Sequence, residues 1–172
     1  MKRLVSVVVV ALALAACSGG RREPAESRLD PGPMVQPGWH KRVATIDGRL
    51  FTDGAETLLL PEGLTGTLID VDLVGSSGLE LVGFGIADAT RNYSSVDIMP
   101  SWPPVTSDIA ADAIHLDQPL QIDAGRSSEL LIGMRATRVG LVTRRGIDVT
   151  YEVGGVRYRV RFPAAWKIRV TS

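Results

Sequence analysis

The sequence IDVTYEVGGVRYRVRF, which runs from Ile147 to Phe162, decides the fold of this chain. Apolar and polar residues alternate on both sides of Gly154-Gly155, a dipeptide typical of the two-residue loop of a β-hairpin. With a loop of this length, one face of the hairpin carries all of its large apolar side chains: Ile147, Val149, Tyr151, Val153, Val156, Tyr158, Val160 and Phe162. The other face pairs Glu152 with Arg157, Asp148 with Arg161 and Thr150 with Arg159. The register, the charges and the apolar pattern therefore agree.

This register makes opposite predictions for two neighbouring positions of the second strand. A slip of one residue would turn the apolar face to water, so a charge placed on that face is expected to destroy the domain. We expect Val160→Asp to do so, and Arg159→Glu on the polar face to be tolerated. Burial contributes about 1.5–3 kcal/mol per large apolar side chain, whereas a cross-strand pair contributes about 0.2–1 kcal/mol.

Outward from the hairpin, the chain after residue 41 consists of short β-segments separated by Gly, Pro, Asp and Asn. Residues 64–74 alternate well, with one face formed by Thr65, Thr67, Ile69, Val71 and Leu73 and the other bearing Asp70 and Asp72. Further strands are expected at residues 43–46, 49–52, 79–87, 96–99, 114–116, 120–123, 129–136 and 165–170, and a loose helical turn at 108–113. About seven to nine short strands without a long helix predict an all-β protein, an antiparallel β-sandwich rather than a barrel.

The C-terminal part of this predicted sandwich carries several loose motifs. They are Pro-Leu-Gln-Ile-Asp-Ala-Gly at 119–125, the alternating Leu130, Ile132 and Met134, then Val139-Gly140, and Val149-Thr150-Tyr151. Their order resembles the C-terminal half of bacterial immunoglobulin-like or fibronectin-like accessory domains. The resemblance implies an immunoglobulin-like sandwich, here without the disulfide and paired tryptophan of antibody domains. It implies no chemistry, because such domains share no catalytic activity.

The N-terminus has the pattern of an export signal. Lys2 and Arg3 precede an apolar run at residues 4–16, which is 13 residues long and is interrupted by Ser6. A helix that crosses a bilayer needs about 20 apolar residues, so this run is too short to span one. It has the length of the apolar region of a signal peptide, and it ends in small residues.

The run ends in Leu14-Ala15-Ala16-Cys17, which resembles the lipobox of bacterial lipoproteins. The resemblance implies that a signal peptide at residues 1–16 is removed, and that Cys17 carries a diacylglycerol with palmitate-type chains. Cys17 is the only cysteine in the sequence, so no internal disulfide competes for its sulfur. Two or three acyl chains hold a protein stably at a membrane. The alternative is an ordinary signal peptide with a chance cysteine.

Residues 17–41 are predicted to form a lipidated cysteine followed by a flexible linker. The segment is rich in Gly and Pro and poor in aliphatic residues, so it buries too little apolar surface to offset the entropy of ordering. Its 24 residues after Cys17 would span roughly 25–30 Å as a random coil. The predicted organisation is a signal peptide at 1–16, the linker at 17–41 and one β-sandwich domain at 42–172.

The charge balance argues against nucleic acid as a partner. Without Lys2 and Arg3, 17 basic residues remain against 19 acidic ones. A near-neutral chain has neither the basic footprint of a nucleic-acid-binding protein nor a polybasic patch for a membrane. The expected contact with the membrane is therefore the lipid on Cys17.

No motif predicts catalysis, and we expect a protein that is not an enzyme. A Gly-x-Ser-x-Gly elbow is missing from the sequence, and a Ser-His-Asp triad would have to be assembled from scattered hydroxyls with His40 or His115. His40 lies in the predicted linker, which does not hold a side chain in a fixed geometry. Gly83-Phe84-Gly85 lies within a strand pattern, where glycines mark a bulge or a close approach of the backbone. We expect no cofactor.

A metal site is the weaker alternative. Two histidines and one cysteine do not make a usual zinc site. Met99, His115 and Met134 are of the ligand types that suit copper(I), but they are isolated in the sequence. Met134 also alternates with Leu130 and Ile132, as a core residue would. We expect no bound metal, with a copper-type or small-ligand carrier as the alternative.

The remaining candidate is the segment from Met99 to Pro104, in the longest irregular region of the domain. Loops of a sandwich often carry binding residues, and tryptophan is enriched at interaction hot spots. We therefore predict a partner-binding loop formed by Met99, Trp102, Pro103 and Pro104. In the alternative, Trp102 folds back as a cap on the core and the prolines stiffen a crossover.

Together, these features predict a lipid-anchored, non-catalytic β-sandwich of the bacterial cell envelope that binds or supports another envelope component, a protein or a glycan. The alternative is a small-ligand or metal carrier at the membrane surface. Ser18 after Cys17 favours the outer membrane, facing the periplasm, in a Gram-negative bacterium. In a Gram-positive bacterium the same anchor places the protein on the outer face of the plasma membrane.

Overall fold

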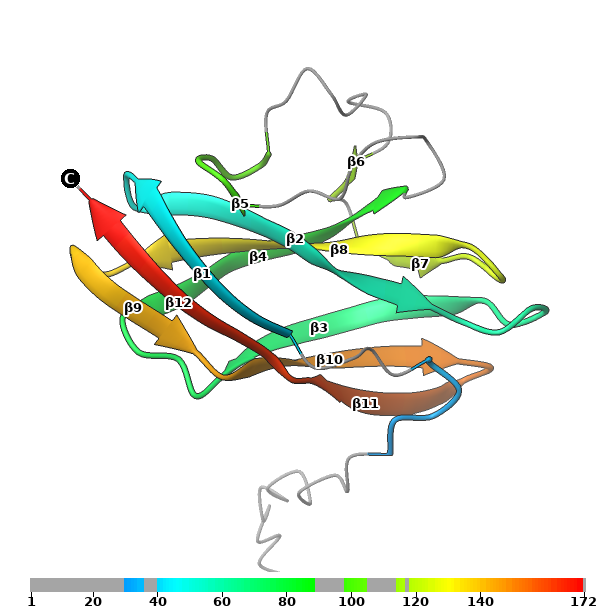
Figure 1. Cartoon of the computed structure of the whole chain (residues 1–172). Coiled ribbons are helices and arrows are strands. Elements are labelled where there is room, and N and C mark those ends of the chain that lie inside the picture. Colours follow the sequence, from blue (N-terminus) through cyan, green and yellow to red (C-terminus); the bar gives the residue numbers. More distant parts are fainter. Residues whose placement is uncertain (1–29, 36–39, 89–97, 105–113, 117, 172) are drawn as a thin grey trace, which may run out of the picture.

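The computed structural model describes residues 30–35, 40–88, 98–104, 114–116 and 118–171 (Figure 1). The strands in these ranges are β1 (His40–Asp47), β2 (Leu50–Leu59), β3 (Gly66–Val74), β4 (Leu79–Asp88), β5 (Ile98–Met99), β6 (Ile114–His115), β7 (Leu120–Ile122), β8 (Ser127–Ala136), β9 (Gly140–Arg144), β10 (Gly146–Val153), β11 (Val156–Phe162) and β12 (Ala164–Thr171). In this part of the chain no helix has the length and apolarity to cross a membrane. The helical turn predicted at 108–113 lies outside the described residues.

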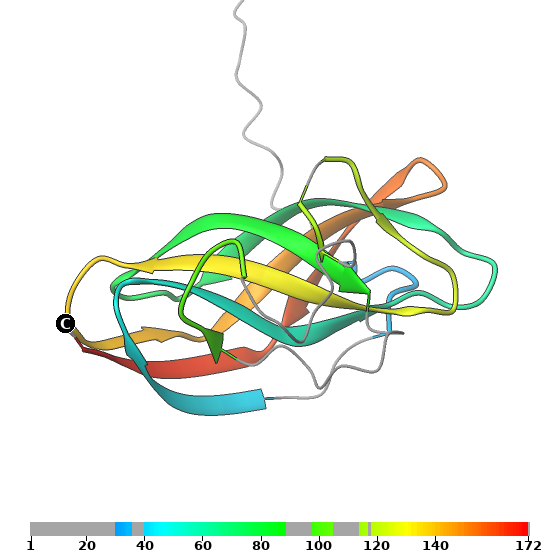
Figure 2. The same ribbon diagram turned by 90° about the horizontal axis from the view of Figure 1, so that it is seen from above.

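The strands form layers around a shared apolar core. The first layer is the sheet β5-β2-β8-β4-β6. The second layer consists of two sheets, β1-β12-β9 and β11-β10-β3-β7. Two long strands run from one of these sheets into the other, since β11 continues into β12 at Pro163 and β9 continues into β10 at Arg145. Figures 1 and 2 show β2, β8 and β4 crossing over these long bent strands. The predicted all-β class is confirmed and the layers are consistent with a sandwich. The interrupted long strands and the short β5 and β6 raise the strand number above the expected one.

The decisive hairpin has the predicted register along its whole length, from Ile147 opposite Phe162 to Val153 opposite Val156. Its apolar face supplies a large part of the core, where the side chains with at most 1% exposure are Ile147, Val149, Tyr151, Val160 and Phe162. The burial of this face decreases towards the loop. Val156 is 52% exposed there, because the tip of the hairpin lies beyond the buried part of the sheet.

The alternation predicted for residues 64–74 is broken by a bulge in β3. Thr150 of β10 lies opposite Asp70, but the next residue, Tyr151, lies opposite Leu68, so Ile69 is the extra residue. The bulge brings both Leu68 and Val71 into the core, at 0% and 1% exposure. The predicted common face of Thr67, Ile69 and Val71 was therefore wrong for the residues before the bulge. Strict alternation holds only where the pairing of the two strands is unbroken.

The sequence reading missed β9, whose five residues contain the two charged or polar side chains of Thr143 and Arg144. This strand pairs with β12 along one edge, and its other edge forms a single β-bridge with Ser77. The Ser77 and Thr143 backbones exchange two hydrogen bonds, of 2.7 and 3.0 Å. Tertiary pairing, rather than local pattern, therefore decides this element.

The predicted linker ends earlier than residue 41, because residues 30–35 pack onto the hairpin. Met34 is 3% exposed and belongs to the core, and its N–H donates a 3.0 Å hydrogen bond to the Tyr151 hydroxyl. That hydroxyl in turn donates to the carbonyl of Pro31. The Arg159 N–H donates to the Asp30 carbonyl at 3.1 Å. The domain boundary predicted at residue 42 thus falls inside the folded body.

Candidate functional site

A cavity of about 310 Å³ lies between the ends of the two layers. The first layer contributes β4, β6 and β8 to its wall, and the second layer contributes β7 and the turn after it. Strand pairing fixes the neighbours, since His115 of β6 lies opposite Ile86 of β4, and Ser128 of β8 lies opposite Asp88. The cavity therefore rests on paired strands and not on one loop.

The floor and the rim of this cavity differ in character. Buried or partly buried apolar side chains line the floor, including Ile86, Leu116 and Leu120. Polar and ionisable side chains surround the opening: Asp88, His115, Gln121, Asp123 and Arg126. Two carboxylates accept hydrogen bonds, while the guanidinium and the amide donate them. The arrangement suits a small uncharged ligand that has several hydroxyl groups and an apolar surface.

Sequence reasoning considered His115 of the rim as a metal ligand, but it did not predict this cavity. Asp88 ends a strand and Arg126 belongs to a turn, and such positions are common for solvated charges in any sandwich. Their convergence depends on β6 pairing with β4 while β7 pairs with β3 in the other layer. No local signal could have revealed it.

The three residues considered as copper ligands do not converge. Met134 is fully buried in the main core, where it lies opposite Phe51. Met99 packs on the other side of the same sheet, and His115 is exposed on β6. Among the described residues, no group of three or more His, Cys, Asp or Glu side chains could hold a metal ion.

Trp102 packs against the outer face of the first layer. It joins a small apolar cluster with Ala87, Leu131 and Met99. The ring lies on two glycines, because a Cβ on Gly83 would be 3.1 Å from it and a Cβ on Gly133 would overlap it. The predicted close backbone approach at the glycines of β4 is thus confirmed. Trp102 has a packing role, while the partner-binding role of Met99, Trp102, Pro103 and Pro104 stays a prediction.

Cys17, the predicted lipidation site, lies outside the described residues, as does the predicted signal peptide at residues 1–16. The anchor is therefore a proposal and is taken up below.

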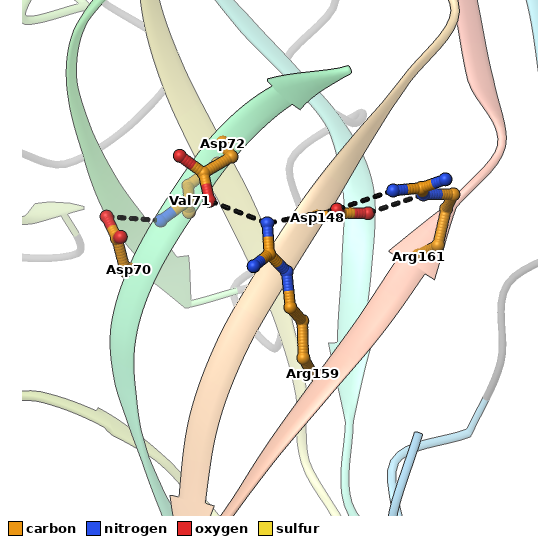
Figure 3. Close-up of polar contacts among 6 residues, drawn as sticks. All are labelled: Asp70, Val71, Asp72, Asp148, Arg159 and Arg161. Carbon is orange, nitrogen blue, oxygen red and sulfur yellow. Dashed lines mark hydrogen bonds and ion pairs between the residues drawn. The ribbon is translucent and has the colours of Figure 1, made fainter. Parts of the chain in front are cut away.

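A ladder of charges crosses the outer face of three strands in the second layer (Figure 3). Arg161 of β11 binds Asp148 of β10 through two hydrogen bonds, of 2.6 and 2.7 Å. Arg159 lies within 2.9 Å of Asp72 on β3 and 3.1 Å of Asp148. The hydrogen bonds with Asp148 raise the pKa of Arg161. Since the charges satisfy one another, this ladder reads as a structural feature.

The expectation that Arg159→Glu is tolerated needs correction on this geometry. A carboxylate at position 159 would lie beside Asp72 and the nearly buried Asp148, whose side chain is 4% exposed. The sequence placed Thr150 opposite Arg159, which is confirmed, but the long guanidinium reaches past it to the acids of two other strands.

An ion pair that the sequence did not predict lies in the core. Arg144 of β9 binds Asp53 of β2 at 2.5 Å, and both side chains are 0% exposed. The Arg144 Nε also donates to the carbonyl of Ala164 at 3.2 Å, and its guanidinium carbon lies 5.9 Å from the centre of the Trp166 ring. The pair joins the two layers. The one available signal was the alternation of Arg144 with Val142, which placed a charge on an inward face.

Comparison with known proteins gives little more. No family model and no curated protein matches the chain. Among solved structures, the VesB protease of Vibrio cholerae is similar to 84% of this chain and over 33% of its own length, with 9% identity and a TM-score of 0.36. The chain thus spans about a third of the length of that protease.

This neighbour overturns one expectation. We had expected a protein that is not an enzyme, and a structural neighbour that is a protease contradicts it, so we withdraw it. At this TM-score the likeness carries no argument for proteolysis or for any other chemistry of the chain.

Proposed function

We propose that this chain is a lipoprotein of the bacterial cell envelope whose β-sandwich binds a sugar unit of an envelope glycan in the cavity between its layers. The acyl chains on Cys17 hold it outside the cytoplasm, at the outer membrane or on the outer face of the plasma membrane. The proposal joins the predicted anchor to the cavity described above.

The observation that carries the proposal is the mixed lining of the cavity. Its volume of about 310 Å³ is at the lower end of ligand pockets, which measure roughly 300–1,000 Å³, and suits a single ring rather than an extended chain. Sugar hydroxyls both donate and accept, so they pair with the carboxylate of Asp123 and with the donors of Gln121 and Arg126. The apolar floor faces the C–H groups of the ring.

The place where the chain joins the body supports access to the cavity. Asp30 lies beside β11 in the second layer, whereas β4 and β6 of the cavity wall belong to the first (Figure 1). If residues 18–29 act as the tether, they span roughly 17–21 Å. Such a tether lets the cavity turn away from the membrane.

We also propose that the sandwich is immunoglobulin-like. In one layer the strand order is β2-β8-β4. In the other layer β12 lies beside β9, and β10, which continues β9, lies beside β3. These orders match strands B-E-D and G-F-C of an immunoglobulin domain, which supports the assignment. The parallel edge strand β1 beside β12 is an addition to this plan.

The anchor is tested by expressing the chain with its N-terminus intact, in the wild type and as Cys17→Ser. We expect the wild type in the membrane fraction, with the mass of two or three acyl chains added, and the variant released in soluble form. Release of the wild type without added mass would contradict the anchor.

The cavity is tested separately with the non-lipidated protein and a panel of sugars, N-acetylglucosamine and its disaccharide with N-acetylmuramic acid first. Binding is followed by calorimetry and by chemical-shift changes. Asp123→Asn and Arg126→Ala should weaken binding at least about tenfold, which is about 1.4 kcal/mol, because each removes a charged hydrogen-bond partner. Both residues are exposed, so melting temperatures should stay unchanged.

The matched control is Asp70→Asn, which makes the same chemical change on the outer face of β3, where the carboxylate binds only the N–H of Val71 among the contacts seen. Equal binding by the control and the wild type is expected. A panel without any saturable binding, or equal loss in Asp123→Asn and Asp70→Asn, would remove the cavity from the proposal and leave the anchor untouched.

A further inference from the structure

The edges of the sheets differ in how they are protected. An unprotected edge strand presents free backbone N–H and C=O groups to any passing strand, so proteins shorten, charge or cover such edges. Here β5 and β6 have two residues each and β7 has three. The edge of β9 is bridged to Ser77 by two hydrogen bonds. On β11 the side chains of three arginines, Arg157, Arg159 and Arg161, line the strand, and the N–H of Arg159 is bound by Asp30.

Among the described strands, β1 is the long edge strand that is neither shortened nor bridged, and its charged residues lie towards its two ends. It has eight residues without a proline, and all eight pair with β12 in one unshifted parallel register. Figure 2 shows β1 along one margin of the body, with β12 on its inner side. At its centre Val43 is 77% exposed, the most exposed of the large apolar side chains in the described residues.

The exposed face of β1 is complementary to itself. It carries Lys41, Val43, Thr45 and Asp47, so a positive charge lies near one end and a negative charge at the other. An antiparallel second copy, related by a two-fold axis at Ala44, would place Lys41 opposite Asp47 twice and Val43 opposite Thr45 twice. Opposite charges directly across two strands stabilise their pairing, and like charges oppose it.

We propose that β1 pairs with β1 of a second copy of this chain, antiparallel and in this register, to form a symmetric dimer. The two β1-β12-β9 sheets then join into one continuous sheet of six strands. The pairing is isologous, as a two-fold dimer requires. It covers both copies of Val43 and pairs the backbones of the two edge strands. It depends neither on the lipid anchor nor on the ligand of the cavity.

Asp47 remains available for this pairing. Its Oδ1 accepts hydrogen bonds from the N–H of Gly48 and from the hydroxyl of Thr171, at 3.0 and 3.2 Å. The carboxylate is exposed, so Oδ2 of the same group can accept from the ammonium of Lys41 in the second copy.

The test uses residues 17–172 with Cys17→Ser, which keeps every described residue, and measures the mass by sedimentation at increasing concentration. We expect a reversible dimer in the wild type. Lys41→Asp and Asp47→Lys should each raise the dissociation constant by about tenfold or more, because each places two like-charged pairs across the dimer axis. An equimolar mixture of the two variants should recover a heterodimer, and the double swap should recover a homodimer.

Lys167→Asp is the matched control, since it makes the same charge change on β12, one strand in from the edge, opposite Val43. It should dimerise like the wild type.

A mixture of Val43→Cys and Thr45→Cys proteins should form a mixed disulfide faster than either protein by itself forms a disulfide. A wild type that stays monomeric up to about 1 mM would overturn the proposal. Single charge variants that dimerise like the wild type, with unchanged melting temperatures, would overturn the register and with it the proposal.

Discussion

Replacing Arg144 with methionine tests the buried ion pair that joins the two layers. The substitution keeps an unbranched side chain of similar length and removes the charge, so packing changes little. It leaves the Asp53 carboxylate in a core where both partners are 0% exposed. In the described structure Asp53 Oδ1 has no hydrogen-bond partner, and Oδ2 would lose the guanidinium 2.5 Å away.

The expected loss follows from desolvation. Removing one partner of a buried pair destabilises a protein by about 3–5 kcal/mol, because the remaining charge stays buried without compensation. The free energy of unfolding of a domain is about 5–15 kcal/mol in total, so Arg144→Met alone consumes a large part of it. Replacing both partners by apolar residues is often neutral or stabilising by about 1–4 kcal/mol. We therefore expect Asp53→Leu with Arg144→Met to be at least as stable as the wild type.

The assay is urea unfolding followed by tryptophan fluorescence, which includes the signal of Trp166, whose ring lies 5.9 Å from the Arg144 guanidinium. Wild type, both single variants and the double variant form a double-mutant cycle, which isolates the coupling between the two side chains. A loss below about 1 kcal/mol in Arg144→Met would refute the reasoning, because a value that small is typical of an exposed pair. Additive single losses in the double variant would refute it as well.

Three further outcomes are expected. Val160→Asp should abolish folding because it buries a charge in the core, while Arg159→Glu should lower the free energy of unfolding by about 1–3 kcal/mol; equal soluble yields of the two variants would contradict the register. Gly133→Ala should lower the melting temperature by overlapping the Trp102 ring, and Trp102→Ala combined with it should recover part of the loss, as calorimetry can show. Burial raises the pKa of Tyr151, so the stability that its neutral hydroxyl provides is complete below about pH 10, the usual value, and is lost as the pH rises through the folded-state pKa. Tyr151→Phe should remove that alkaline decline in urea titrations; an unchanged decline would assign it to other groups.

The sequence by itself determined the parts of the fold that depend on local alternation. The hairpin register needed only the spacing of apolar residues around Gly154-Gly155, because side chains alternate strictly along an unbroken strand. The all-β class followed from the same periodicity in the other segments. The close approach at the glycines of β4 was also readable, since glycine within a strand pattern has few other uses. Lipidation of Cys17 rests on sequence alone and awaits its test.

Tertiary structure decided everything that depends on which strands become neighbours. The bulge at Ile69, the strand β9 and the packing of Met34 all arise from pairing or burial between segments far apart in the chain. The cavity gathers Asp88, His115 and Arg126 because β6 joins one layer while β7 joins the other. A charge such as Arg144 looks like a surface residue in the sequence, and only the Asp53 side chain facing it from the other layer allows it to be buried. Local propensity carries no information on such distant partners, because each contact is fixed by the closure of the whole core.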